Sequence, residues 1–230
     1  MRGPSIGRTI SLSVILGFIA WTAVRAIGAR PVAIPSSPFP RPTVDEPLAS
    51  AKGKETVVLA GGCFWGVQAV FEHLNGVNSA TSGYSGGRIK SPSYEMVSSG
   101  LTGHAESVSV TFDPSQITFG QILMVFFSIA HDPTQLNRQG PDTGSQYRSA
   151  IFYSNDEQKR IAEAYVAQID AAQVYSRKIV TQIASFEAFY RAEEYHQEYL
   201  ANHPNEPYIV YNDLPKLDRL KQQFPELYRK

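Results

Sequence analysis

The alternation of apolar and polar residues after residue 52 predicts short strands and amphipathic helices in a definite order. Residues 55–62, "ETVVLAGG", form a β-branched run ended by glycines, which is typical of a buried strand. Residues 64–74 place their large apolar side chains on one helical face, so they predict a short helix. Residues 76–87 predict a second strand that runs into a glycine-rich loop, and the pattern then predicts a strand at 105–114, a well-buried helix at 119–130 and a strand at 148–155.

This order, β-α-β-β-α-β, predicts an α+β domain with the split β-α-β arrangement of ferredoxin-like folds. We expect a mixed or largely antiparallel sheet with helices on one face and long functional loops. Ser154 with Glu157 has the spacing of a capping box, which predicts that the next helix begins there. Residues 192–200, "AEEYHQEYL", are expected to be helical, and a last helix is expected from residue 214 onward.

Two long segments show no regular periodicity, residues 82–104 and 131–147. Both are polar, glycine-rich and tyrosine-bearing, and at most one short helical turn interrupts the first. Loops of this length inside a compact domain are usually functional. The sequence therefore predicts that these two segments form the walls of a site.

The first fifty residues have a different pattern from the rest. Arg2 and Arg8 precede an apolar run over 10–24, which has the length of a signal-peptide core and is short for a membrane span. We interpret residues 1–30 as a signal peptide, with an uncleaved N-terminal membrane anchor as the alternative. Prolines are frequent over 31–51 and predict an extended linker. The working domain is then 52–230, and we expect it to be exported, either periplasmic or membrane-anchored outside the cytoplasm.

Composition narrows the classes of function. The chain carries 21 basic and 21 acidic residues, and the first fifty residues hold five arginines against Asp45 and Glu46, so the remainder is slightly acidic. A basic surface of the kind that tracks nucleic-acid phosphates is therefore not expected. Metal binding has weak support, because Glu193 and His196 form a single Glu-x-x-His without a second pair.

The one cysteine, Cys63, lies at a predicted turn between strand and helix, directly after Gly61 and Gly62. A thiol at a helix N-terminus lies near unpaired N–H groups, which favour the thiolate. The alternative is a small buried hydrophobic residue, the commoner fate of a free cysteine. Topology alone leaves both open.

The segment "GGCFWG" around Cys63 resembles the nucleophile motif of the A class of peptide methionine sulfoxide reductases. Further segments resemble that family in its order: "GYSGG", "SYEMV", "TGHAE", "HDPTQLNRQGPDTGSQYRSAI" and "HQEYL". Together they extend from about residue 57 to the "NHPNEPY" loop, which is nearly the whole predicted domain.

The resemblance implies a role for each matching residue. Cys63 would attack the sulfoxide sulfur, and Glu106 would protonate the sulfoxide oxygen. The other implied catalytic residues are Tyr94 and Tyr147, as phenolic donors, and Asp142 nearby. The implied substrate-binding residues are Phe64, Trp65, His196, Tyr199 and Tyr208. The substrate would be methionine S-sulfoxide, free or in oxidised proteins and peptides, and the activity would repair oxidative damage.

The sequence departs from many members of that family in having no cysteine near its C-terminus. A sulfenic acid on Cys63 must therefore meet a thiol from another molecule, a thioredoxin-like protein or glutathione. We expect no bound cofactor.

Two other classes of function remain open from the residues themselves. A cysteine hydrolase or acyltransferase would pair Cys63 with a histidine, either His104 or His196. A non-catalytic module would use Trp65 and the tyrosines as an aromatic cage, leaving Cys63 incidental.

Overall fold

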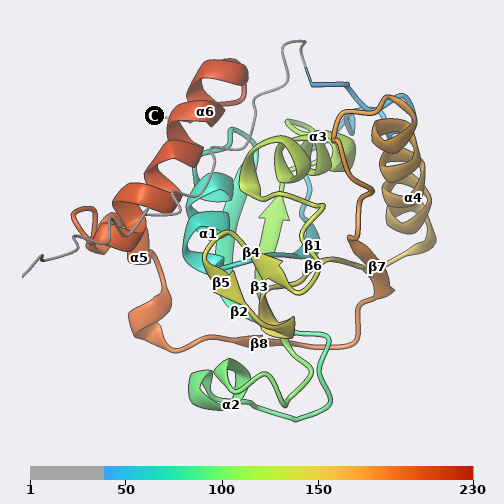
Figure 1. Cartoon of the computed structure of the whole chain (residues 1–230). Coiled ribbons are helices and arrows are strands. Elements are labelled where there is room, and N and C mark those ends of the chain that lie inside the picture. Colours follow the sequence, from blue (N-terminus) through green and yellow to red (C-terminus); the bar gives the residue numbers. More distant parts are fainter. Residues whose placement is uncertain (1–38, 230) are drawn as a thin grey trace, which may run out of the picture. The chain divides into compact units, whose positions relative to one another are not determined.

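The computed structural model describes residues 39–229, which contain one mixed sheet with helices packed on it (Figure 1). The six strands of this sheet lie in the order β7-β6-β1-β3-β2-β8. Their bounds are β1 Glu55–Gly61, β2 Val77–Ser85, β3 Ala105–Phe112, β6 Ser149–Tyr153, β7 Gln182–Ser185 and β8 Phe189–Arg191. Strands β4 (Arg138–Gln139) and β5 (Asp142–Thr143) form a separate small hairpin.

The four central strands have the topology that the sequence predicts. β3 lies antiparallel between β1 and β2, and β6 lies antiparallel on the other side of β1. Helix α1 (Phe64–Glu72) connects β1 to β2, and α3 (Phe119–Val125) lies between β3 and β6 in the chain. The split β-α-β arrangement and the α+β class are confirmed, and the parallel pairing of β7 with β6 makes the sheet mixed.

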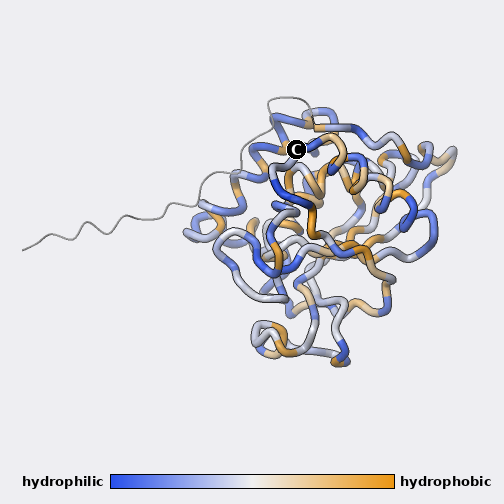
Figure 2. The backbone as a smooth tube through the Cα atoms, turned by 45° about the vertical axis from the view of Figure 1, so that its right-hand side comes forward, coloured by the Kyte–Doolittle hydropathy of each residue, from blue (hydrophilic) through white to orange (hydrophobic). Residues whose placement is uncertain are grey.

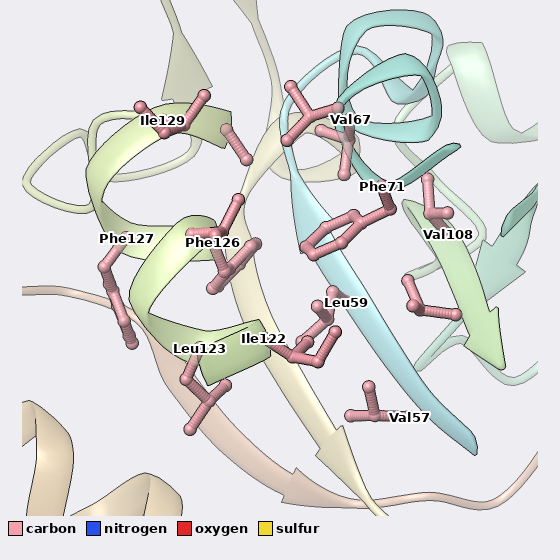
Figure 3. Packing of buried hydrophobic residues seen from close by; sticks show 14 of the residues in the cluster. Val57, Leu59, Val67, Phe71, Val108, Ile122, Leu123, Phe126, Phe127 and Ile129 are labelled. Carbon is pink, nitrogen blue, oxygen red and sulfur yellow. The ribbon is translucent and has the colours of Figure 1, made fainter. Parts of the chain in front are cut away.

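The core lies between the sheet and its helices. Alternate residues of β1, Val57 and Leu59, face α1 and α3, where they meet Phe71 and Ile122 (Figure 3). The intervening residues of β1 face a smaller apolar cluster on the other side of the sheet. Figure 2 shows apolar segments gathered inside the domain and polar segments over its outside.

Two helices differ from the prediction in how they begin or end. Helix α3 has a capping box between Thr118 and Gln121, but after Val125 it widens into a π-helical turn, Phe126–Ala130. Helix α4 (Asp156–Ala171) is capped by Asn155, whose side chain accepts a hydrogen bond from the Gln158 N–H at 2.8 Å. The predicted capping box at Ser154 is therefore wrong by one residue.

The predicted helix over 192–200 is also wrong. A short 3-10 turn, Glu194–His196, is followed by extended Gln197 and left-handed Glu198 (φ 52°), and only then by α5 (Tyr199–Asn202). Gln197 is buried and extends its amide to the backbone of Ser82 on β2, accepting from N–H and donating to C=O, both at 3.0 Å. This pairing extends the sheet edge at the expense of the helix.

Both long loops are inserted into this framework. The first carries α2 (Tyr94–Ser98), the short helical turn that the sequence allowed for, and extends from the lower edge of the sheet in Figure 1. The second contains the β4–β5 hairpin and leads into β6. The chain ends with a π-helical turn, Ile209–Asp213, and α6 (Leu214–Gln223).

Residues 39–49, which we call the strap, pack against helices α3 and α4. Asp45 accepts hydrogen bonds from Thr118 Oγ1 at 2.5 Å and Gly120 N–H at 2.9 Å, at the start of α3. Gln168 of α4 bonds the strap backbone, and Tyr165 donates to the Pro40 carbonyl at 2.6 Å. The described part of the segment expected to be a linker is thus in contact with the domain.

The predicted signal peptide or anchor, 1–30, lies outside the described residues. Within residues 39–229, none of the helices is long and apolar enough to cross a bilayer.

Candidate active site

Cys63 occupies the junction between β1 and α1 and is 9% exposed. The turn requires glycine at 62, where φ is +92° and an added Cβ would lie 2.4 Å from the Gln139 side chain. Cys63 then stands as the N-cap residue of α1, with its own side chain making no capping bond. The sulfur is therefore held at the first turn of a helix inside a nearly closed surface.

The environment of this thiol differs from the expectation of a stabilised thiolate. Burial raises the pKa of Cys63 well above its ordinary value, the negative charges of Glu106 and Asp213 raise it further, and a hydrogen bond from the Trp65 N–H opposes them. Desolvation and neighbouring carboxylates outweigh the helix N-terminus. In the free protein Cys63 is a thiol.

Glu106 lies on β3 and is 2% exposed. Its Oε2 accepts a hydrogen bond from the Phe64 N–H at 3.1 Å, so this carboxyl is attached to the residue that follows the cysteine. Burial raises the pKa of Glu106 to about 8, with the Phe64 N–H opposing and Asp142 adding to the shift. Glu106 is therefore a protonated acid at neutral pH, bonded to the backbone of the residue next to Cys63.

The two predicted phenols belong to the two long loops. Tyr94 begins α2, and Tyr147 ends the 3-10 turn Ser145–Tyr147 before β6. Burial raises the pKa of both, and the charge of Glu106 adds to each shift. Both phenols therefore keep their protons at neutral pH, and both lie near enough to Glu106 for its ionisation to affect their pKa.

Asp142 on β5 is half-buried and accepts a 2.5 Å hydrogen bond from the Tyr208 hydroxyl. Burial raises the pKa of Asp142, although this bond lowers it. The pKa of Tyr208 is raised by burial and by the Cys63 charge. The structure therefore joins a residue predicted to be catalytic with one predicted to bind substrate.

The predicted substrate-binding residues form one aromatic wall. Trp65 stacks on Tyr199 with ring centroids 3.8 Å apart and planes 8° apart, and Tyr208 meets it edge-on at 5.9 Å. The Trp65 indole N–H donates to His196 Nδ1 at 3.1 Å. The centroid of the His196 ring also lies 5.0 Å from that of the Phe64 ring. Contacts or chain adjacency connect nine of the ten residues named from the sequence, and Tyr147 is related to them through the effect of Glu106 and Asp142 on its pKa.

Sequence reasoning missed a buried ion pair at the start of α6. Asp213 is fully buried and pairs with Lys216 at 3.0 Å, and one of its oxygens has no partner among the described residues. An added Cβ on Gly66 would lie 2.0 Å from Asp213 Oδ1, so glycine is required there. Nothing in the sequence pattern marked this pair, because the spacing is that of an ordinary exposed helix face.

Sequence reasoning also missed Glu193 as a site residue, although its spacing to His196 had been noted. Its carboxylate accepts hydrogen bonds from the Tyr84 hydroxyl and the Tyr94 N–H, both at 2.8 Å. Within residues 39–229, no three His, Cys, Asp or Glu side chains come together as metal ligands.

The arrangement bears on the alternative of a cysteine hydrolase. His104 Nδ1 accepts from the Gly87 N–H, and Nε2 bonds the Ile89 carbonyl, so both ring nitrogens are engaged with the backbone. His196 uses Nδ1 for Trp65. Among the described residues, no histidine hydrogen-bonds the thiol as a general base would.

Comparison with known proteins gives a consistent match. The family model described as peptide methionine sulfoxide reductase matches residues 55–228. A Mesorhizobium japonicum protein named peptide methionine sulfoxide reductase MsrA 2 is 59% identical over 179 residues, covering 78% of this chain and 92% of that protein.

Two solved structures are also similar. One is the reduced form of Mxr1 from Saccharomyces cerevisiae, with a TM-score of 0.61 and 35% identity over 71% of this chain and 92% of that one. The other is methionine sulfoxide reductase A of Corynebacterium diphtheriae, with a TM-score of 0.59 and 34% identity over 76% of this chain and 86% of that one.

Proposed function

The chain belongs to the peptide methionine sulfoxide reductase family and is an oxidoreductase, and we propose that it reduces methionine S-sulfoxide through a sulfenic acid on Cys63. The observation that supports this mechanism best is the hydrogen bond from the Phe64 N–H to Glu106. It fixes a protonated carboxyl and the thiol to the same helix turn, which is the arrangement that sulfoxide reduction needs.

The substrate's methyl group would contact the aromatic wall formed by Phe64 and Trp65. Cys63 Sγ attacks the sulfoxide sulfur, while the Glu106 carboxyl protonates the sulfoxide oxygen. Tyr94 and Tyr147 donate hydrogen bonds to that oxygen as its charge grows. Asp142, held by Tyr208, helps to orient the substrate.

The chemistry balances as an exchange of one oxygen atom. A thiol and a sulfoxide become a sulfenic acid and a thioether, so the substrate sulfur is reduced by two electrons and Cys63 is oxidised by two. The thiol proton ends on the transferred oxygen, and Glu106 regains the proton that it lent. The protein is left as Cys63–SOH with methionine released.

Recycling then needs two thiols from outside the chain, because its 230 residues include one cysteine. The first attacks the sulfenic sulfur and expels water to give a mixed disulfide, and the second releases Cys63 as a thiol. A thioredoxin-like protein or glutathione has the required chemistry. Oxidised proteins and peptides are the proposed substrates, and their repair is the proposed role.

We propose export for the same protein, as a periplasmic or membrane-anchored enzyme. The support is the basic and then apolar pattern of residues 1–30. Cell fractionation of the full chain beside a variant with Ile15 and Leu16 replaced by Arg would test it. Equal cytoplasmic recovery of both would contradict export.

The first test of the function is a single-turnover assay on the full chain, reduced and then freed of reductant. With racemic methionine sulfoxide, we expect about one methionine per chain, loss of one thiol and one epimer left unreacted. Cys63→Ser should form none. Methionine formation by Cys63→Ser, or none by the wild type with its thiol intact, would contradict the mechanism.

A further inference from the structure

Glu193 joins the sheet to the helical turn that carries Tyr94. It lies two residues after the end of β8, and its two oxygens accept hydrogen bonds from different parts of the chain, Oε2 from the Tyr84 hydroxyl and Oε1 from the Tyr94 N–H, both at 2.8 Å. Tyr84 is fully buried on β2, opposite Glu106 in the β2–β3 register. One carboxylate therefore connects a fixed point of the core to the first residue of α2.

Helix α2 needs such a connection, because five residues cannot form a stable helix alone. Only Val97 within α2 is buried, and Figure 1 shows α2 in a loop that extends away from the sheet. Gln146 holds the far end by donating to the Ser98 carbonyl at 3.2 Å. The near end, which carries Tyr94, is held by Glu193.

The charge of Glu193 suits this task. Although burial raises its pKa, the hydrogen bonds from the Tyr94 N–H and the Tyr84 hydroxyl bring the pKa below its ordinary value. The carboxylate is therefore ionised at neutral pH. Hydrogen bonds to an ionised acceptor are stronger than those between neutral groups.

His196, three residues after Glu193, holds the other wall of the site. Its Nδ1 accepts the Trp65 indole N–H, which can only donate, so the ring proton lies on Nε2. The His196 ring also packs against Tyr94, with centroids 4.4 Å apart. The Glu-x-x-His pair that resembled part of a metal site instead connects the tyrosine of α2 to the tryptophan of α1.

We propose that Glu193 is a positioning residue for sulfoxide reduction, which fixes the Tyr94 phenol in the site by binding the Tyr94 backbone. The proposal rests on the proposed function, since it assigns Tyr94 as a donor to the sulfoxide oxygen. Glu193 acts through Tyr94, with no contact to the reacting sulfur.

A double-mutant cycle with Tyr94 tests the proposal. Glu193→Ala should slow single-turnover methionine formation about tenfold or more, since misplacing a catalytic group by about 1 Å costs up to about a hundredfold. In a Tyr94→Phe protein the same substitution should cost less than about twofold, because the group that Glu193 positions is already gone. Glu193→Gln keeps an acceptor for the Tyr94 N–H and should recover part of the rate.

Glu194→Ala is the matched control. Glu194 is the adjacent residue, and its side chain is 83% exposed and paired with Arg191 at 2.7 Å. Its rate should equal that of the wild type. Equal slowing by Glu193→Ala in the wild-type and Tyr94→Phe proteins would overturn the proposal, because Glu193 would then act independently of the phenol.

Hydrogen exchange separates this proposal from the proposed function. Backbone amides of residues 93–99 should exchange faster in Glu193→Ala than in the wild type, and at the wild-type rate in Glu194→Ala. This expectation holds whether or not the protein reduces a sulfoxide. Unchanged exchange in Glu193→Ala would overturn the anchoring even in an active enzyme. Faster exchange without methionine formation by the wild type would leave the anchor in place and contradict the proposed function alone.

Discussion

At the scale of single residues, the site combines a thiol with an acid that keeps its proton. Burial raises the pKa of both Cys63 and Glu106, so the free protein holds two protons where the reaction needs them. In the proposed mechanism the thiol gives up its proton only as it attacks the sulfoxide sulfur, and the carboxyl supplies one to the sulfoxide oxygen. Reactivity thus depends on the substrate's arrival and not on a standing thiolate, which would be open to unspecific oxidation.

The reductive step should lose activity as pH rises through about 8, because Glu106 then loses the proton that it donates. Single-turnover rates between pH 6 and 10 would measure this. In Glu106→Gln the rate should be low and without that decline. A wild-type rate that climbs through pH 8 would show that thiolate formation, and not the acid, limits the step.

The same carboxyl should weaken the fold at high pH. The folded pKa of Glu106, about 8, lies above the ordinary 4.5, so the free energy of unfolding falls as pH rises from about 4.5 to 8. Glu106→Gln carries no such cost and should be more stable than the wild type at pH 9, by a few kcal/mol. Urea unfolding at pH 5 and pH 9 measures it, and an advantage of equal size at both would contradict the assignment.

At the scale of elements, the segment around Gln197 shows where sequence patterns stop being informative. Strand β1 was predictable from a continuous apolar run, because both of its faces are buried, and β3 from apolar alternation, because a sheet face is buried. Gln197 interrupts a helical pattern because its amide pairs with the backbone of Ser82, more than a hundred residues away in the chain. A long-range bond of this kind leaves no local periodicity to detect.

The candidate site divides in the same way. Cys63, Glu106 and the aromatic residues could be named from a family resemblance, because each lies in a matching segment. The Asp213–Lys216 pair could not, because its burial follows from the packing of the last helix against Gly66. From the sequence, Glu193 could be named only as the first residue of a Glu-x-x-His pattern. Its hydrogen-bond partners on β2 and α2, Tyr84 and Tyr94, are known only from the structure.

Replacing Gln197 by Leu should destabilise the domain by about 1–3 kcal/mol, since it leaves the buried Ser82 N–H without a partner, while the Ser82 C=O keeps its hydrogen bond from the Ala192 N–H at 2.9 Å. It should also raise the substrate concentration needed for half-saturation, because His196 and Tyr199 lie on either side and both contact Trp65. Thermal unfolding and single-turnover titration measure the two effects. Gln173→Leu, an exposed replacement after α4, is the control and should change neither.

At the scale of the whole molecule, the strap makes the domain larger than its sheet and helices suggest. It bonds α3, α4 and, through Arg41 and Glu226, the C-terminal segment. None of the residues that the strap contacts belongs to the aromatic wall. The strap therefore contributes to stability without taking part in the chemistry.

A fragment of residues 52–230 should unfold at a lower temperature than one of residues 39–230, by roughly 5–10 °C for a loss of about 2–3 kcal/mol. The α3 cap by Asp45 and the partner of Tyr165 are both lost in the shorter fragment. Single-turnover rates of the two should agree at low temperature. Asp45→Ala in the longer fragment isolates the cap, and equal melting of all three proteins would show that the strap adds nothing.

The strap also sets an order of events during synthesis. It leaves the ribosome before any part of the sheet, yet its partners on α3, α4 and the C-terminal segment come at residues 118–120, 165–168 and 226. It can dock only after these have been made, so a segment that is translated before the whole sheet is among the last to be fixed. The prolines of the strap favour this late docking, because they restrict the backbone before it binds and so reduce the conformational entropy lost on binding.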